Sequence, residues 1–373
     1  MAGSDNNFML RALERAAAAL FRSSPNPRVG CVLVSPTGQV IGEGSTQAAG
    51  SAHAEVMALR DAASRGHATQ GATAYVTLEP CSHQGRTGPC CDALREAGIA
   101  RVVAATADPN PLVAGRGIER LRAAGVDVQV GPCAAQAREL NLGFFSRMQR
   151  GQPWVRLKAA TSLDGATALA NGASQWITSA QARADGHAWR ARACAVLTGI
   201  GTVLEDDPRL DAREVATPRQ PRLVVLDSRL RTPPGARLFE VPDREVLIAT
   251  TEAAFASPQR ARLEERGAMV VPLPAHEDQV DLTALLRMLA DRGVNELHVE
   301  AGARLNGALL RQGLVDELLL YLAPKLLGSG ARGLSDWGPL DTLAQGVELQ
   351  LREVAQVGPD LRLLARVAGR DEF

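Results

Sequence analysis

Short apolar runs alternate with helix-forming segments along the whole chain, and this alternation limits the possible folds more than any other feature. In the first part of the sequence, strand-like runs lie at 29–34, 72–78, 100–106 and 126–130. Helical patterns separate them at 53–65, 90–98 and 115–124. Gly98 and Gly125 follow two of these segments, where a helix C-cap is expected. The pattern is typical of an α/β fold.

A second series begins after the segment MQRGQP at 148–153, where Gly and Pro interrupt the pattern. Its apolar runs are continuous, as in parallel strands covered on both faces. The strand-like runs are 155–161, 195–201, 222–228, 245–251, 268–274 and 296–302, and the helical segments are 179–193, 281–292 and 304–312. The two series do not resemble each other, which excludes an internal repeat. We therefore predict two unrelated α/β domains, at 1–148 and 153–373.

The composition argues against several classes of function. The 41 Lys and Arg residues balance 41 Asp and Glu residues, and aromatic residues make up only 3%, so we expect no nucleic-acid partner. No apolar stretch approaches the ~20 residues of a membrane span, so we expect no membrane association. The N-terminal segment contains Asp5 and Glu14 and does not resemble a signal peptide. We expect a cytoplasmic protein whose six cysteines are free thiols or metal ligands.

The strongest chemical signal is the triplet His53-Ala54-Glu55, followed by Pro80-Cys81 and by Cys90. One imidazole and two thiolates form a zinc-binding set that leaves the fourth tetrahedral position open for water. We predict one Zn²⁺ at His53, Cys81 and Cys90, where it would activate that water near neutral pH. Glu55 would take a proton from the water and pass it on to the departing amine, as in zinc-dependent deaminases.

The other cysteines and the nearby histidine have simpler interpretations. Cys91 adjoins a predicted ligand but would point elsewhere on a helix, and Cys31, Cys133 and Cys194 are expected to be small packed residues. His83 lies in the same loop and is a rival ligand, although a fourth protein ligand would close the position needed for water.

In the second half, no strand-like run that we predict is followed by a G-x-G-x-x-G motif. Gly199-Ile200-Gly201 and Gly328-Ser329-Gly330 are Gly-rich turns, and their spacing alone favours tight turns over ligand-binding loops. From the residues themselves, this half is an α/β domain with Gly-rich strand ends, where ligand crevices commonly occur.

On its motifs the chain resembles the bifunctional riboflavin-biosynthesis deaminase/reductase family. The deaminase half of that family is matched by NPRVG at 26–30, HAE at 53–55, TLEPCSHQGRTGPC at 77–90 and DPNP at 108–111. The resemblance implies a cytidine-deaminase-like three-layer domain that removes the C2 amine of 2,5-diamino-6-ribosylamino-4(3H)-pyrimidinone 5′-phosphate. It also implies substrate contacts from Asn26, Arg86 and Asn110. Thr46 stands where the family usually has His, which puts one substrate contact in doubt.

The second half resembles the reductase of the same family in KAATSLDG at 158–165, SQWIT at 174–178, TVLEDDP at 202–208 and VEAG at 299–302. This implies a dihydrofolate-reductase-like α/β domain that uses NADPH to reduce the ribosyl group to ribityl. The implied NADPH contacts are Ala160, Trp176, Thr202, Asp206, Ser228, Gly302, Ala303, Arg304, Leu305, Asn306, Gly307 and Ala308. The implied substrate contacts are Ser174, Arg190, Leu210, Arg213 and Glu300, with the two arginines pairing with the 5′-phosphate.

Lys158 and Asp206 are the polar groups that we expect nearest the reacting sugar carbon. There they would orient and polarise the substrate while the cofactor supplies the hydride.

The family resemblance also suggests a homo-oligomer, either a dimer or a tetramer. Three alternatives stay open at this point. One is a deaminase of tRNA or cytidine with a substrate-presenting second half. The second is a zinc-dependent ligand sensor without turnover, and the third is a chain whose deaminase is impaired by Thr46.

Overall fold

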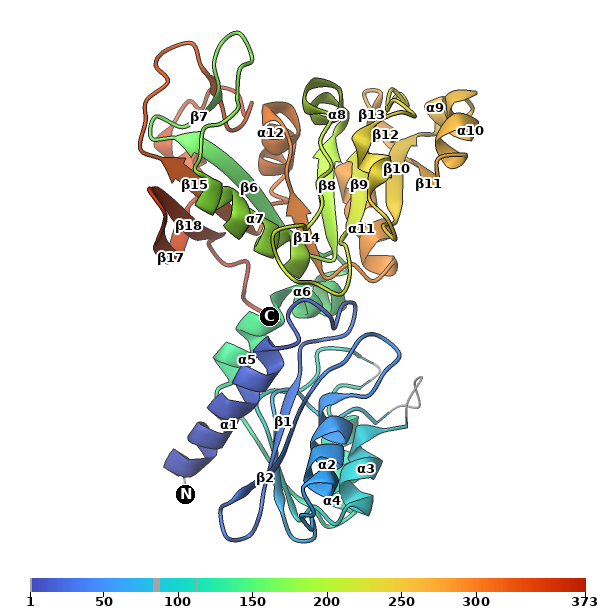
Figure 1. Cartoon of the computed structure of the whole chain (residues 1–373), viewed down its shortest axis with the longest axis vertical. Coiled ribbons are helices and arrows are strands. Elements are labelled where there is room, and N and C mark those ends of the chain that lie inside the picture. The colour runs from blue at the N-terminus through green and yellow to red at the C-terminus, as the bar shows by residue number, and fades with distance from the viewer. Residues whose placement is uncertain (1, 83–87, 112) are drawn as a thin grey trace. The chain divides into compact units, whose positions relative to one another are not determined.

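The computed structural model describes residues 2–82, 88–111 and 113–373, and the chain divides into two compact units (Figure 1). Unit 1 comprises residues 1–151 and unit 2 comprises residues 152–373. Each unit has its own sheet, so each is described by itself.

The five strands of unit 1 form one sheet in the order β2-β1-β3-β4-β5. Strand β1 is antiparallel to both of its neighbours, whereas β3, β4 and β5 are parallel. The bounds are β1 (Gly30–Val34), β2 (Val40–Ser45), β3 (Thr73–Val76), β4 (Arg101–Ala104) and β5 (Asp127–Val130). Four of these strands lie within the predicted runs. The sequence VIGEGS of β2 was not predicted as a strand, because two glycines replace apolar residues in it.

Helices cover both faces of this sheet, which gives three layers (Figure 1). Their bounds are α1 (Ala2–Ala17), α2 (Ala54–Ser64), α3 (Cys90–Glu96), α4 (Arg116–Ala123), α5 (Ala134–Leu140) and α6 (Leu142–Arg150). On one face, Met9 of α1 and Ala137 of α5 pack against Val32 and Tyr75. The linker expected at 148–153 is partly helical, since α6 continues to Arg150.

On the other face, α2 packs directly onto the backbone of β2. A Cβ atom at Gly42 would lie 2.4 Å from the Ala58 carbonyl oxygen, and one at Gly44 would lie 2.2 Å from that of Ala54. Both glycines are therefore required for this close approach. The packing of α2 on these glycines fixes the position of its first turn, which directly follows the predicted zinc ligand His53.

Unit 2 contains a nine-stranded sheet in the order β11-β10-β9-β8-β14-β6-β15-β18-β17. The seven strands from β11 to β15 are parallel, and β18 and β17 extend the sheet in antiparallel pairing. The bounds are β6 (Trp154–Ser162), β8 (Ala195–Gly199), β9 (Arg222–Leu226), β10 (Val246–Thr251), β11 (Ala268–Leu273), β14 (Glu296–Val299), β15 (Glu317–Ala323), β17 (Leu349–Val357) and β18 (Asp360–Val367). Two short ribbons pair β7 (Ala166–Ala168) with β16 (Arg332–Gly333) and β12 (Ala275–His276) with β13 (Gln279–Val280).

The central strands of unit 2 are buried on both faces, which explains their continuous apolar runs. In β8, Ala195 and Leu197 point into one core with Leu285, whereas Val196 points into another with Val203. The helices are α7 (Ala180–Arg192), α8 (Ile200–Asp206), α9 (Glu252–Phe255), α10 (Gln259–Glu264), α11 (Leu282–Asp291) and α12 (Ala303–Arg311), with short 3₁₀ turns at Arg237–Glu240 and Leu343–Gln345.

Candidate active sites

In unit 1, three metal-binding side chains converge from three different elements. His53 caps the N-terminus of α2, Cys81 follows β3, and Cys90 is the first residue of α3. His53 Nδ1 lies 3.6 Å from Cys81 Sγ and 3.3 Å from Cys90 Sγ, and all three donor atoms lie within 4.8 Å of one another. This donor set fits zinc with one coordination position open. Cys91 is buried in α3 outside the group.

The contact between the two thiols of this cluster shifts their pKa values in opposite directions. A hydrogen bond from the Cys90 thiol lowers the pKa of Cys81 to about 4. The same contact raises the pKa of Cys90. A metal binds the thiolate form of cysteine, so the lowered pKa of Cys81 favours metal binding at this position.

Glu55 lies in the first turn of α2, two residues after His53, and its side chain is buried. Burial raises the pKa of Glu55 to about 7, and the negative charge of Cys81 adds to this effect. A carboxylate with a pKa near neutrality can both accept and return a proton under physiological conditions. The residue therefore has the properties of a general acid and base next to the metal-binding group.

The remaining predicted residues of unit 1 lie in loops. Asn26 lies in a turn where its N–H donates to the Ser23 carbonyl, and the backbone N–H of Asn110 donates to Asp108 Oδ1 at 2.8 Å. The buried Thr46 hydroxyl accepts from the Val29 N–H at 3.1 Å and lies 3.3 Å from the Val29 carbonyl oxygen. Thr46 thus links the end of β2 to Val29, in the segment that follows Asn26. Arg86 and His83 lie outside the described residues.

One buried carboxylate at this site was not predicted. Glu79 accepts four backbone hydrogen bonds, from the N–H groups of Asp108, Gly115, Gly117 and Ile118. A signal existed in the sequence: the glycines at the start of α4 offer no capping side chain, so the capping group had to come from elsewhere.

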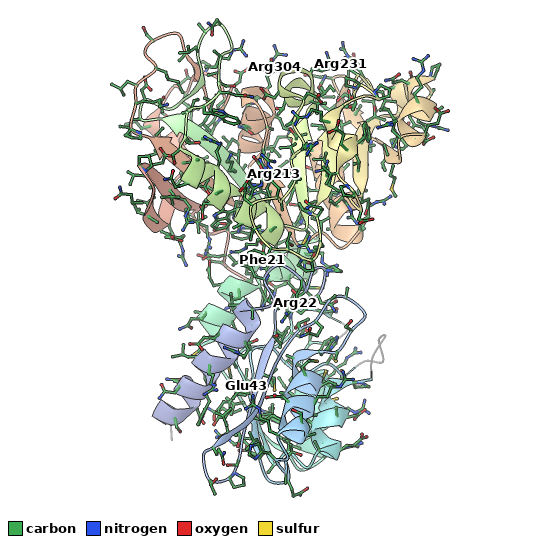
Figure 2. The ribbon with its side chains drawn as sticks, in the orientation of Figure 1. Phe21, Arg22, Glu43, Arg213, Arg231 and Arg304 are labelled. Atoms are coloured by element: carbon green, nitrogen blue, oxygen red, sulfur yellow. The ribbon has the colours of Figure 1, made fainter. Side chains whose placement is uncertain are left out.

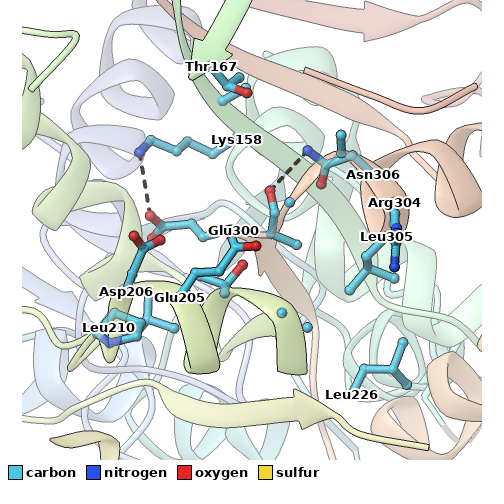
Figure 3. A pocket seen from close by; sticks show the side chains of 18 of the residues that line it. Lys158, Thr167, Glu205, Asp206, Leu210, Leu226, Glu300, Arg304, Leu305 and Asn306 are labelled. Atoms are coloured by element: carbon cyan, nitrogen blue, oxygen red, sulfur yellow. Dashed lines mark hydrogen bonds and ion pairs between the residues drawn. The ribbon is translucent and has the colours of Figure 1, made fainter. Parts of the chain in front are cut away.

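In unit 2, a pocket of about 2390 Å³ opens at the carboxyl ends of the parallel strands (Figure 3). This is where ligands bind in open α/β sheets. It brings together most of the residues predicted for this half: Lys158, Ala160, Ser174, Trp176, Arg190, Thr202, Asp206, Leu210, Arg213, Ser228, Glu300, Gly302, Ala303, Arg304, Leu305, Asn306 and Ala308. Gly307 does not line the pocket. A Cβ there would lie 2.0 Å from the Asp336 carbonyl oxygen, so Gly307 serves packing.

Glu300 is the centre of a charge cluster within this pocket (Figure 3). Lys158 Nζ lies 3.4 Å from Glu300 Oε2, and Arg190 binds both carboxylate oxygens through Nε and Nη2. His298 Nε2 lies 3.4 Å from Oε1. Burial alone would raise the pKa of Glu300, but Arg190 and Lys158 hold it well below its ordinary value. Glu300 therefore favours its ionised form and pairs with two cations.

The surroundings of this cluster bear on the predicted roles of four residues. Arg190 also donates to the Asp211 carbonyl, so its guanidinium is engaged inside the protein. Arg213 pairs with the Asp211 side chain and is half exposed at the pocket, which makes it the better candidate for a phosphate contact. Lys158 contacts Glu300, whereas Asp206 lies at the exposed end of α8 (Figure 3).

Comparison with known proteins gives the family. Residues 153–363 match the model of the RibD C-terminal domain, and residues 2–106 match that of the cytidine and deoxycytidylate deaminase zinc-binding region. The riboflavin biosynthesis protein RibD of Escherichia coli is 47% identical over 371 residues, which cover 96% of this chain and 98% of that protein. The chain belongs to the RibD family.

Solved structures of RibD proteins have the same fold over their whole length. Acinetobacter baumannii RibD is 42% identical, has a TM-score of 0.89, and the match covers 99% of this chain and 100% of that one. The Thermotoga maritima diaminohydroxyphosphoribosylaminopyrimidine deaminase/5-amino-6-(5-phosphoribosylamino)uracil reductase is 32% identical, with a TM-score of 0.86 and coverage of 98% and 99%.

The RibD match confirms the predicted family, the α/β fold class with a deaminase and a reductase domain, and the bifunctional riboflavin-biosynthesis activity. The first domain contains a zinc-binding region, and the second is a reductase domain of the kind that uses a nicotinamide cofactor. A reductase model over 153–363 favours this interpretation over a nucleic-acid deaminase with a presenting module, and over a sensor without turnover. Within the described residues, no helix has the length and apolar character that crossing a membrane requires.

Proposed function

We propose that this RibD protein catalyses two successive steps on one pathway intermediate. The first is hydrolytic deamination of 2,5-diamino-6-ribosylamino-4(3H)-pyrimidinone 5′-phosphate, and the second is NADPH-dependent reduction of the ribosyl group to ribityl. The observation that supports this most strongly is the placement of Glu55 beside His53, Cys81 and Cys90 on a chain that also contains the unit 2 pocket.

In the first step, His53, Cys81 and Cys90 would hold one Zn²⁺, which supplies Lewis-acid activation of water when it is bound. The Glu55 carboxylate accepts a proton from the attacking water and delivers it to the departing C2 amine, which leaves as ammonia. Asn26, Asn110 and Arg86 are the proposed substrate contacts.

In the second step, NADPH bound in the unit 2 pocket would supply the hydride that reduces C1 of the ribosyl group in its ring-opened imine form, while the imine nitrogen takes up a proton. Gly302 caps the start of α12, whose first N–H groups are suited to bind cofactor phosphate. Lys158, held by Glu300, would polarise the reacting carbon. Arg213 is the proposed partner of the substrate 5′-phosphate.

The choice of NADPH over NADH is supported by the residues that follow β9. Enzymes specific for NAD often bind the adenosine ribose with a free carboxylate near a strand end, whereas an arginine accommodates a 2′-phosphate. Here the Asp227 carboxylate is buried and accepts from the N–H and the hydroxyl of Thr232, each at 2.7 Å. Arg229 and Arg231 are exposed, line the pocket and have no ion-pair partner among the described residues. Arg231 and Arg304 lie at the same end of unit 2 (Figure 2).

Replacement of Arg229 and Arg231 together by Ala is expected to raise the KM for NADPH by about 10-fold or more and to leave the KM for NADH nearly unchanged. The physical reason is that both guanidinium groups would contact only the 2′-phosphate. Steady-state reductase kinetics with each cofactor measure this. The exposed Arg262 on α10 offers a matched control, as R262A should change neither value. Equal losses with NADPH and NADH would contradict the assignment.

We also propose that the protein forms a homo-oligomer through strand β17. This strand is the outer edge of the nine-stranded sheet, and it exposes Leu349, Leu351 and Val354. An exposed apolar edge favours pairing with another strand, here that of a second copy. Light scattering is expected to show a dimer or tetramer, and L351E should shift it toward monomer. A wild-type protein that is monomeric at micromolar concentration would contradict this proposal.

A mass-spectrometric time course tests the whole proposal. Zinc-loaded protein is incubated with the diaminopyrimidinone ribosylamino phosphate, first without and then with NADPH. We expect exchange of an amine for oxygen without NADPH, followed by a gain of two hydrogens when NADPH is added. Reduction without exchange would indicate a deaminase impaired at Thr46. A substrate mass that never changes would refute the proposed function.

A further inference from the structure

The Glu79 carboxylate lies at the junction between the cysteine loop and the loop that follows β4. The side chain is 3% exposed, and its four hydrogen bonds to backbone N–H groups range from 2.9 to 3.3 Å. Oε2 accepts from Asp108 and Gly115, whereas Oε1 accepts from Gly117 and Ile118. A carboxylate bound by several backbone amides is strongly held in place.

Part of this arrangement caps helix α4. Its N-cap residue is Gly115, with a φ of 80°, and a glycine has no side chain that could accept from the first N–H groups. Glu79 supplies that acceptor from a distant segment, and its negative charge is favourable at a helix N-terminus. Gly117 allows the approach, since a Cβ there would lie 2.0 Å from the Pro80 carbonyl oxygen.

A side chain of the same helix also binds residues that follow the two cysteine ligands. Arg120 of α4 donates to the Ser82 carbonyl at 3.3 Å and to Asp92 Oδ2 at 2.7 Å. Ser82 follows Cys81 directly, and Asp92 lies two residues after Cys90. Helix α4 is therefore bonded to the segments that follow both cysteine ligands.

The hydrogen bond from the Asp108 N–H also ties Glu79 to the loop that follows β4. Strands β3 and β4 are parallel neighbours, so the loops after them share one edge of the sheet. The Glu79 N–H donates to the Thr106 carbonyl at 3.0 Å, and the Asp108 side chain accepts from the N–H of Asn110. The backbone and the side chain of Glu79 therefore both bind the cysteine loop to the segment that leads into residues 108–110.

We propose that Glu79 is a positioning residue for deamination, which holds the segment 108–110 against the metal-binding loop so that it can receive the pyrimidine. This inference rests on the deaminase activity proposed above. Glu79 acts through the backbone of the loop and has no chemical step of its own. It therefore determines how well substrate binds more than how fast the bound substrate reacts.

The test is the variant Glu79→Gln in the full-length, zinc-loaded protein. Glutamine keeps the size of the side chain but presents an NH₂ group to a site that offers only N–H donors. We expect the deamination KM to rise by about 10-fold or more, with kcat within about 3-fold of wild type. Zinc content and the reductase kinetics of the same chain should not change. Glu119→Gln, an exposed carboxylate on the same helix, is the matched control and should behave as wild type.

Hydrogen exchange identifies a purely structural role. Faster exchange at the N–H groups of Gly117 and Ile118 in E79Q, together with an unchanged KM, would show that Glu79 only caps α4 and would overturn the proposal. Loss of zinc from a folded variant would also overturn it, because Glu79 would then position the ligands. If E79Q does not fold, Gly117→Ala displaces the same loop and must raise KM in the same way. A wild-type protein without deaminase activity would instead refute the proposed function.

Discussion

Glu55→Gln is expected to lower the deamination rate by about 10³-fold or more, while zinc remains bound. Glutamine has almost the same shape, so the three metal-binding side chains keep their places. It cannot accept the proton of the attacking water, however, and cannot return a proton to the departing amine. Ammonia release without NADPH, measured together with zinc content by atomic absorption, would show the effect.

The same chain provides the control for this variant. Reduction of the already deaminated intermediate takes place in unit 2, and its rate should equal that of wild type. Glu119→Gln should retain both activities, since Glu119 is exposed and belongs to neither site. Deamination by E55Q at the native rate would show that another group transfers the proton.

The sequence predicted the buried part of the fold better than its edges. The runs at 155–161 and 195–201 became β6 and β8, because strands covered on both faces must be apolar throughout. Strand β17 was missed because Arg352 and Glu353 interrupt its apolar residues. Most of the strand is exposed, so its sequence does not show the continuous apolar run of a buried strand. Strand β15, with the sequence ELLLYLA, is as apolar as its neighbours and could have been predicted by the same criterion.

The proximity of the metal-binding side chains in the first site was predictable from the sequence motifs, whereas the contacts that support them were not. His53 and Glu55 are two residues apart at the start of one helix, so their proximity follows from local structure. Glu79 binds amides 29 to 39 residues away, and such contacts depend on how the strands pair. In the second site, Arg190 of α7 pairs with Glu300, which follows β14, and the sequence did not indicate this contact.

Glu300→Gln is expected to reduce both the stability and the activity of the reductase unit. The Glu300 side chain is 10% exposed, and the change leaves Lys158 and Arg190 without their shared counter-ion. Breaking a buried ion pair from one side costs about 3–5 kcal/mol. We expect a loss of that size in the free energy of unfolding of unit 2, and a fall in reductase kcat/KM of about 100-fold or more because Lys158 is no longer held. Denaturant titration and steady-state kinetics measure the two effects.

The pH dependence of the stability loss in E300Q shows whether the missing charge causes it. The pKa of Glu300 is lower in the folded protein than the value of about 4.3 expected in an unfolded chain. Its contribution to stability is therefore complete above that unfolded value and is lost as the pH falls through the folded pKa. The difference between wild type and E300Q should be largest at pH 7 and should shrink in strong acid. Glu205→Gln, in the same pocket but with a largely exposed side chain, should cost less than about 0.5 kcal/mol at any pH. An E300Q deficit that is independent of pH would mean that lost packing, and not lost charge, destabilises the variant.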